Sequence, residues 1–192
     1  VLLKNEGGLL PLDPALKTLA VIGPNAHDAE VLWGNYNGIP SRSVTPLDGL
    51  RARVSPQTQV LFAPGCDLLD PATDGFAEAL DVARRADVVI FVGGISQRVE
   101  GEEEIVDGVP RGDRESIELP AVQESLLQQL HALGKPVVLV LLNGGPLSIP
   151  WADAHLPAIL EAWYPGEEGG AAIADVLFGD YNPAGRLPVT VY

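Results

Sequence analysis

The chain has 192 residues, of which 46% are hydrophobic, and this is enough to bury the core of one domain. Its 26 acidic residues outnumber 12 basic ones and give a net charge of −14, which argues against nucleic acid and anionic membranes as partners, because both need a positive surface. No apolar run reaches the length of a transmembrane helix. The single cysteine, Cys66, excludes an internal disulfide.

Five short apolar segments recur along the chain, and each is followed by Gly, Pro or Asn residues that favour a turn. They span residues 19–22, 60–62, 88–92, 137–142 and 158–163. Strands that are apolar on both faces are typical of a parallel sheet that is covered by helices.

Between several of these segments, apolar residues recur at helical spacing. Such patterns cover residues 74–86, the segment from Pro120 to Gly134, and residues 168–178. Residues 34–46 are rich in Gly, Asn, Pro and Ser and are expected to be irregular. The alternation predicts an α/β fold: an open, mainly parallel sheet with helices on both faces.

The most informative stretch is residues 89–120, in which an apolar strand ends at a glycine pair and a long acidic loop follows. Glu100, Glu102, Glu103 and Glu104 lie in this loop. In α/β proteins, functional residues concentrate in loops at the carboxyl ends of strands, and a glutamate held there is suited to general acid catalysis. A solvated acidic surface loop is the alternative.

The common cofactor motifs are missing from the sequence. The first strand ends in Gly-Pro-Asn-Ala rather than a dinucleotide-binding glycine motif, and neither a phosphate-binding loop nor a nucleophile elbow occurs. His27, His131 and His155 are scattered without the spacing of metal ligands. We therefore expect neither a cofactor nor a metal.

Several segments together resemble the second, α/β-sandwich domain of glycoside hydrolase family 3. They are VLLKNEGGLLPL, LAVIGPNA, LNGGPLSIPW and AWYPGEEGGAAIADVLFGDYNPAGRLPVTVY. The resemblance implies that a (β/α)8 barrel with an aspartate nucleophile precedes this domain in the same protein. Residues 1–18 are then the linker from that barrel and residues 19–192 the α/β-sandwich domain. The chain begins with valine and carries no signal peptide, so we expect a piece of a longer protein whose compartment is open.

The resemblance also implies site residues. The segment GGISQRVEGEE resembles the loop of family β-xylosidases that carries the acid/base glutamate, which places this role at Glu100, with Glu102 and Glu103 as rivals if the register shifts. Asn35 and Tyr36 are candidate substrate-binding residues, although packing against the barrel is an equal alternative. For Asp113 and Arg114 an ion pair that fixes the loop end is favoured over substrate contact.

The implied function is that of a retaining exo-β-glycosidase, which acts on β-linked oligosaccharides or glycosides. Such enzymes need two carboxyl groups, so the isolated domain is expected to be inactive. Xylose is the favoured sugar and glucose the close alternative. Two other classes stay open: a non-catalytic carbohydrate-binding or interaction domain, and a nucleotide-binding domain, which the missing glycine motif opposes.

Overall fold

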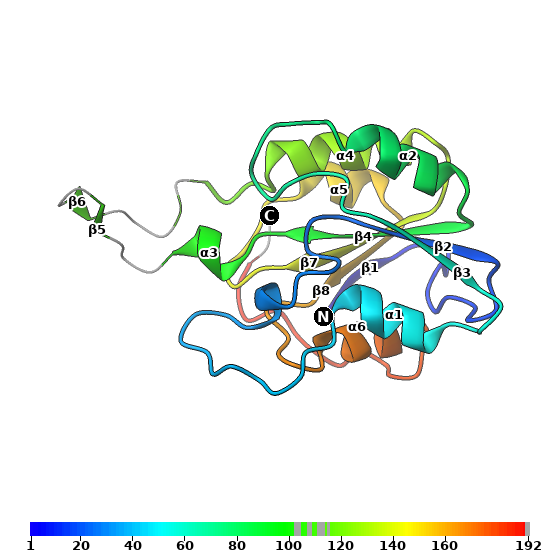
Figure 1. The fold of residues 1–192 in the computed structure, drawn as a ribbon, viewed down its shortest axis with the longest axis horizontal. Helices are drawn as coiled ribbons and strands as arrows, with labels where there is room; N and C mark the ends of the chain where they lie inside the picture. The colour runs from blue at the N-terminus through cyan, green and yellow to red at the C-terminus, as the bar shows by residue number, and fades with distance from the viewer. Residues whose placement is uncertain (102–104, 107–108, 111–113, 115, 191–192) are drawn as a thin grey trace.

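A computed structural model of the chain describes residues 1–101, 105–106, 109–110, 114 and 116–190. Its centre is a six-stranded sheet with the order β1-β8-β7-β4-β2-β3 (Figure 1). The strands are β1 (Leu2–Asn5), β2 (Thr18–Ile22), β3 (Gln59–Ala63), β4 (Val88–Gly94), β7 (Val137–Leu142) and β8 (Ala158–Glu161). A separate antiparallel pair joins β5 (Ile105–Val106) and β6 (Val109–Pro110).

The sheet is parallel except at one edge, where β1 pairs antiparallel with β8. Strand β7 is buried along its whole length, and β4 is buried from its second residue on. This is expected for central strands that are covered on both faces. The predicted open and mainly parallel sheet is confirmed.

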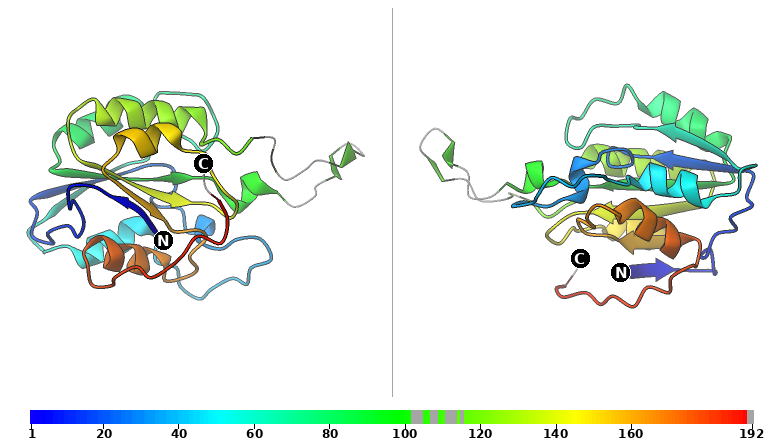
Figure 2. Two further views of the ribbon diagram at one scale, coloured as in Figure 1. Left: turned by 180° about the vertical axis from the view of Figure 1, so that it is seen from behind. Right: turned by 60° about the horizontal axis from the view of Figure 1, so that its bottom comes forward.

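Helices cover both faces of the sheet (Figures 1 and 2). One face carries α2 (Phe76–Arg84), α4 (Ala121–His131) and α5 (Pro150–His155), and the other carries α1 (Pro46–Arg53) and α6 (Gly169–Leu177). Neighbouring strand residues point to opposite sides, so Phe91 and Leu139 pack in the core under α2 and α4, whereas Ile90 and Val140 pack in the core under α1 and α6. None of the described helices is long and apolar enough to cross a membrane.

Three structural elements differ from the expectations. Residues 2–5 form the edge strand β1, although the segment 1–18 was interpreted as a linker; its boundary at residue 18 stays a prediction. Helix α1, which begins at Pro46 directly after the region expected to be irregular, was not predicted. The side chain of Thr45 caps it by accepting a hydrogen bond from the backbone N–H of Asp48 (3.2 Å). The short helix α5 was also not predicted.

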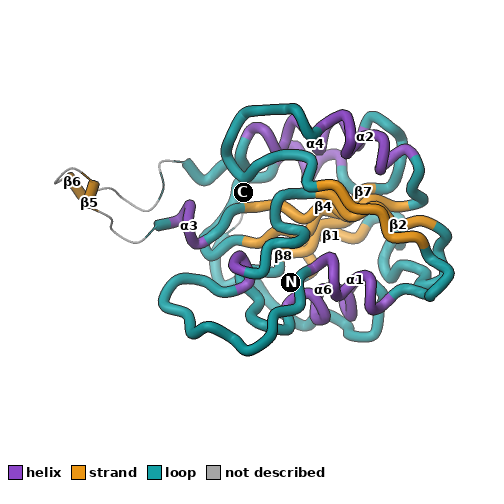
Figure 3. Tube along the Cα trace, in the orientation of Figure 1, coloured by secondary structure: helices purple, strands orange, loops and turns teal. Residues whose placement is uncertain are grey.

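The topology brings three loops together. Strands β4, β7 and β8 are neighbours that run in the same direction. The loops that follow Gly94, Leu142 and Glu161 therefore leave the sheet together, along the edge formed by the carboxyl ends of the strands (Figure 3). The chain turns from β2 toward β3 and then crosses back to β4, so a topological switch point lies between β2 and β4. Ligands of open α/β sheets bind at the carboxyl ends of strands beside such points.

Candidate active site

Glu100 ends a short helix, α3 (Gln97–Glu100), directly after β4. This helix is fastened to the loop after β2. Arg98 forms ion pairs with Asp28 (2.5 Å) and Glu30 (2.7 Å), and the side-chain amide of Gln97 donates to the backbone carbonyl of Glu30 (3.0 Å). The position of Glu100 is therefore set by contacts that reach about 70 residues back along the chain.

The carboxylate of Glu100 accepts hydrogen bonds from two other loops. The backbone N–H of Gly144 donates to Oε2 (3.0 Å) and that of Gly145 donates to Oε1 (2.6 Å). The hydroxyl of Tyr164 donates to Oε2 (2.5 Å). Three donors from the loops after β7 and β8 thus converge on a side chain that is carried by the loop after β4.

Glycine suits the 144–145 turn because the carboxylate of Glu100 lies close to its backbone. A Cβ atom on Gly144 would lie 2.5 Å from Oε2 of Glu100 and 2.9 Å from the ring of Tyr164. One on Gly145 would lie 3.0 Å from the guanidinium of Arg114. The sequence identified this glycine pair only as a strand-end turn, whereas its two N–H groups also bind the candidate carboxylate.

Tyr164 is half-buried, and its burial raises the pKa of the phenol, with a further increase from the hydrogen bond to Glu100. The hydroxyl consequently keeps its proton at neutral pH and can donate the hydrogen bond to Glu100. Arg114 lies beside the same turn and donates from Nη2 to the backbone carbonyl of Pro146 (2.9 Å).

The other predicted site residues lie as follows. The side-chain amide of Asn35 donates to the backbone carbonyl of Gly101 (3.0 Å), so this residue lies directly beside the end of α3. Tyr36 is 88% exposed and has a positive φ of 57°. Glu102, Glu103 and Asp113 lie outside the described residues.

Glu161 is a further carboxyl near this edge, and it is not among the site residues predicted from the sequence. It ends β8 and is 1% exposed. Burial raises the pKa of Glu161 to about 7, against 4.5 for the free side chain, and the negative charge of Glu100 adds to the increase. A charged or polar residue at the end of an otherwise apolar strand was the signal that could have revealed it.

This pKa predicts a pH dependence of stability. The folded domain binds the proton of Glu161 more tightly than the unfolded chain does. The resulting contribution of Glu161 to the free energy of unfolding is therefore fully present below pH 4.5 and is lost as the pH rises to about 7. Over this pH range the free energy of unfolding of the wild-type domain should fall by about 3 kcal/mol because of Glu161. We expect Glu161→Gln to lack this fall, as measured by urea unfolding. Glu78→Gln, at an exposed position of α2, is the control, and an unchanged pH profile in Glu161→Gln would contradict the assignment.

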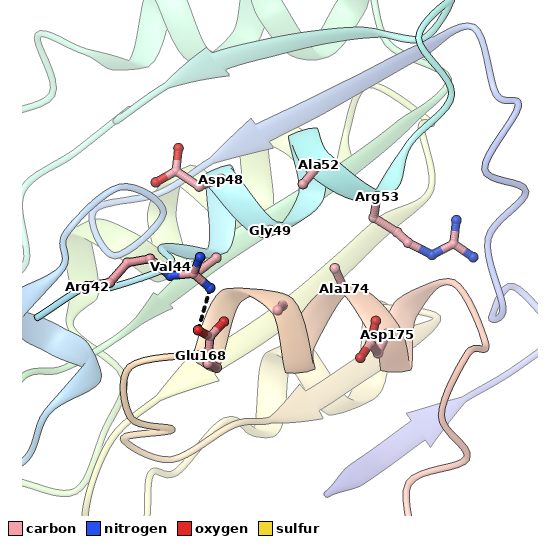
Figure 4. A pocket seen from close by; sticks show the side chains of 10 residues that line it. Arg42, Val44, Asp48, Gly49, Ala52, Arg53, Glu168, Ala174 and Asp175 are labelled. Atoms are coloured by element: carbon pink, nitrogen blue, oxygen red, sulfur yellow. Dashed lines mark hydrogen bonds and ion pairs between the residues drawn. The ribbon is translucent and has the colours of Figure 1, made fainter. Parts of the chain in front are cut away.

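A depression away from these residues lies between α1 and α6 and has a volume of about 430 Å³ (Figure 4). Its two arginines are paired: Arg42 with Glu168 (2.5 Å), and Arg53 with Asp180. It contains none of the residues that the sequence predicted for the site. In the described part of the chain, no three His, Cys, Asp or Glu side chains gather closely enough to hold a metal ion.

Comparison with known proteins decides the family. A model of the glycosyl hydrolase family 3 C-terminal domain matches residues 1–192. The chain belongs to this family. A curated β-xylosidase from Formosa agariphila is 42% identical to this family 3 domain over 197 residues, which covers 99% of this chain and 26% of the relative.

Solved structures agree with this assignment. A family 3 exo-β-xylosidase in complex with a xylobiose aziridine activity-based probe has a TM-score of 0.85 and 39% identity, and the match covers 97% of this chain and 23% of the other. A β-glucosidase from Erythrobacter marinus has a TM-score of 0.90 and 40% identity, over 99% of this chain and 28% of the other. The family 3 domain therefore spans about a quarter of the length of these relatives.

Proposed function

We propose that this domain supplies the acid/base carboxyl group of a retaining exo-β-glycosidase, and that Glu100 is this group. The nucleophilic carboxylate would come from a barrel domain of the same protein, in agreement with relatives that are about four times as long as this chain. The observation that carries the proposal is the convergence of three hydrogen-bond donors on Glu100 at the carboxyl edge of the sheet.

The geometry suits one of the two tasks of such a residue, that of the general base. In a retaining glycosidase one carboxyl group protonates the leaving oxygen and then, as a carboxylate, removes a proton from the attacking water. The amides of Gly144 and Gly145 and the hydroxyl of Tyr164 stabilise the carboxylate that exists between these steps. Since the donors are fixed by the fold, the carboxylate keeps one position while its charge changes.

The contacts of Glu100 support a catalytic domain over a non-catalytic carbohydrate-binding or interaction domain. In a solvated acidic loop a glutamate side chain would have water as its main partner. Here the carboxylate binds the backbone of one loop and a half-buried tyrosine of another, and its helix is fixed by Arg98. The chain has a net charge of −14 and many carboxylates. These contacts restrict the position of the Glu100 carboxylate among them.

For the substrate we propose a β-linked xyloside, with a β-glucoside as the alternative. The β-xylosidase from Formosa agariphila supports the first, and the β-glucosidase from Erythrobacter marinus supports the second. Asn35 and Tyr36 are proposed to contact the sugar, because the loop that carries them lies against Gly101, next to Glu100. The ratio of kcat/KM on nitrophenyl β-xyloside and β-glucoside in the full-length protein distinguishes the two.

The proposal predicts that the domain is folded but inert on its own. It contributes one of the two carboxyl groups that the reaction needs, so residues 1–192 should hydrolyse neither nitrophenyl β-xyloside nor nitrophenyl β-glucoside above the buffer rate. The measurement is release of nitrophenol by the purified domain, with circular dichroism to show that it is folded. Turnover that copurifies with the domain and is lost in Glu100→Ala would contradict the division of the site between two domains.

A further inference from the structure

Glu161 has no part in the proposed chemistry, yet it is the one acidic side chain that is buried in the described part of the chain. Burying a carboxyl group costs free energy unless hydrogen bonds compensate for the lost water. Its two oxygens should therefore be satisfied by specific partners, and the identity of these partners indicates what the residue does.

One oxygen of Glu161 holds the turn after β7. The side-chain amide of Asn143 donates to Oε2 of Glu161 (3.3 Å) and also to the backbone carbonyl of Gly145 (2.9 Å). A single amide group thus ties Glu161 to the turn whose N–H groups bind Glu100. Asn143 is itself fully buried, so its position is fixed.

The other oxygen holds the turn after β8. The backbone N–H of Trp163 donates to Oε1 of Glu161 (3.1 Å). Trp163 has a φ of 57°, a left-handed conformation that is uncommon for a bulky residue and costs about 1–3 kcal/mol. This conformation directs the chain into Tyr164, the third donor to Glu100.

We infer that Glu161 is a positioning residue: its two oxygens hold the turns 143–145 and 162–164 so that their three donors converge on Glu100. The inference rests on the proposed role of Glu100. The contacts form one continuous path, because every donor to Glu100 lies in a turn that Glu161 binds directly or through Asn143.

The negative charge of Glu100 faces Glu161 from another element and raises the pKa of Glu161. The two carboxyl groups therefore interact, in line with a supporting role for Glu161.

The test is a double-mutant cycle in the full-length enzyme with Glu161→Ala and Glu100→Ala. With a xyloside that has a poor leaving group and therefore needs protonation, Glu161→Ala should reduce kcat by about 10²-fold with little change in KM, since misplacing a catalytic group by 1 Å costs this much. In the Glu100→Ala background the same change should alter the residual rate less than twofold, because there is no carboxylate left to position.

Glu161→Gln serves as the conservative variant and replaces Glu161→Ala in the cycle if the latter does not fold. It keeps an acceptor for Trp163, so we expect a loss of only about tenfold, which corresponds to one hydrogen bond. Equal losses in both backgrounds, or an unchanged kcat in the single variant, would overturn the inference while Glu100→Ala alone is still slow. A normal rate in Glu100→Ala alone would instead overturn the proposed function.

Discussion

In the full-length protein, Glu100→Ala should lower kcat/KM for a xyloside with a poor leaving group by about 10³-fold. General acid catalysis contributes 10²–10⁴-fold, and a poor leaving group needs the full protonation. With a dinitrophenyl xyloside, departure needs little assistance, so formation of the glycosyl-enzyme should persist while its hydrolysis becomes slow. A burst of dinitrophenol with reduced kcat and reduced KM, measured by stopped flow, is the expected result.

Glu102→Ala and Glu103→Ala are the matched controls, because these glutamates belong to the same acidic loop and were the rivals for the role. Both variants should retain rates close to those of the wild type on both substrates. If one of them shows the burst while Glu100→Ala does not, the assignment is shifted along the loop. The hydrogen bonds from Gly144, Gly145 and Tyr164 would then have a purely structural meaning.

The second large effect is expected for Gly144→Ala. The new methyl group would lie 2.5 Å from Oε2 of Glu100 and 2.9 Å from the Tyr164 ring, so one of these side chains must move. Displacing the carboxylate by about 1 Å should reduce kcat on nitrophenyl xyloside by about 10²-fold. Gly144 has no positive φ, so the substitution should leave the backbone of the turn intact.

Gly38→Ala is the control for this variant. A Cβ atom on Gly38 would meet no atom within 4 Å, and its backbone is not left-handed, so activity and melting temperature should both be unchanged. Near-normal turnover of Gly144→Ala, with the fold intact, would show that the turn does not hold the catalytic carboxylate.

Much of the fold follows from the sequence because the central strands are apolar on both faces. The runs that became β2, β4 and β7 could be recognised without any knowledge of their neighbours. The edge strand β1 could not, since its residues are only partly buried and the pattern LLKN carries no period. Helix α1 was missed although Thr45, Pro46 and Asp48 form a clear start signal, because two arginines in its last turn leave few apolar residues.

The site could be predicted only where its residues are local. Glu100 follows a strand and a glycine pair, which was sufficient to select its loop. Its partners Gly144 and Tyr164 are 44 and 64 residues further along the chain, and only the order β4-β7-β8 brings their loops together. The left-handed conformation of Trp163 has no sequence signal, because a bulky residue seldom adopts it.

The central claim, that Glu100 is the acid/base residue, is tested most directly by adding azide to the Glu100→Ala enzyme during turnover of dinitrophenyl β-xyloside. Azide needs no general base, so it should attack the stalled glycosyl-enzyme, restore kcat by more than tenfold, and give the β-xylosyl azide as product. The product can be identified by NMR. Turnover of Glu100→Ala that azide does not accelerate, with xylose as the only product, would contradict the account.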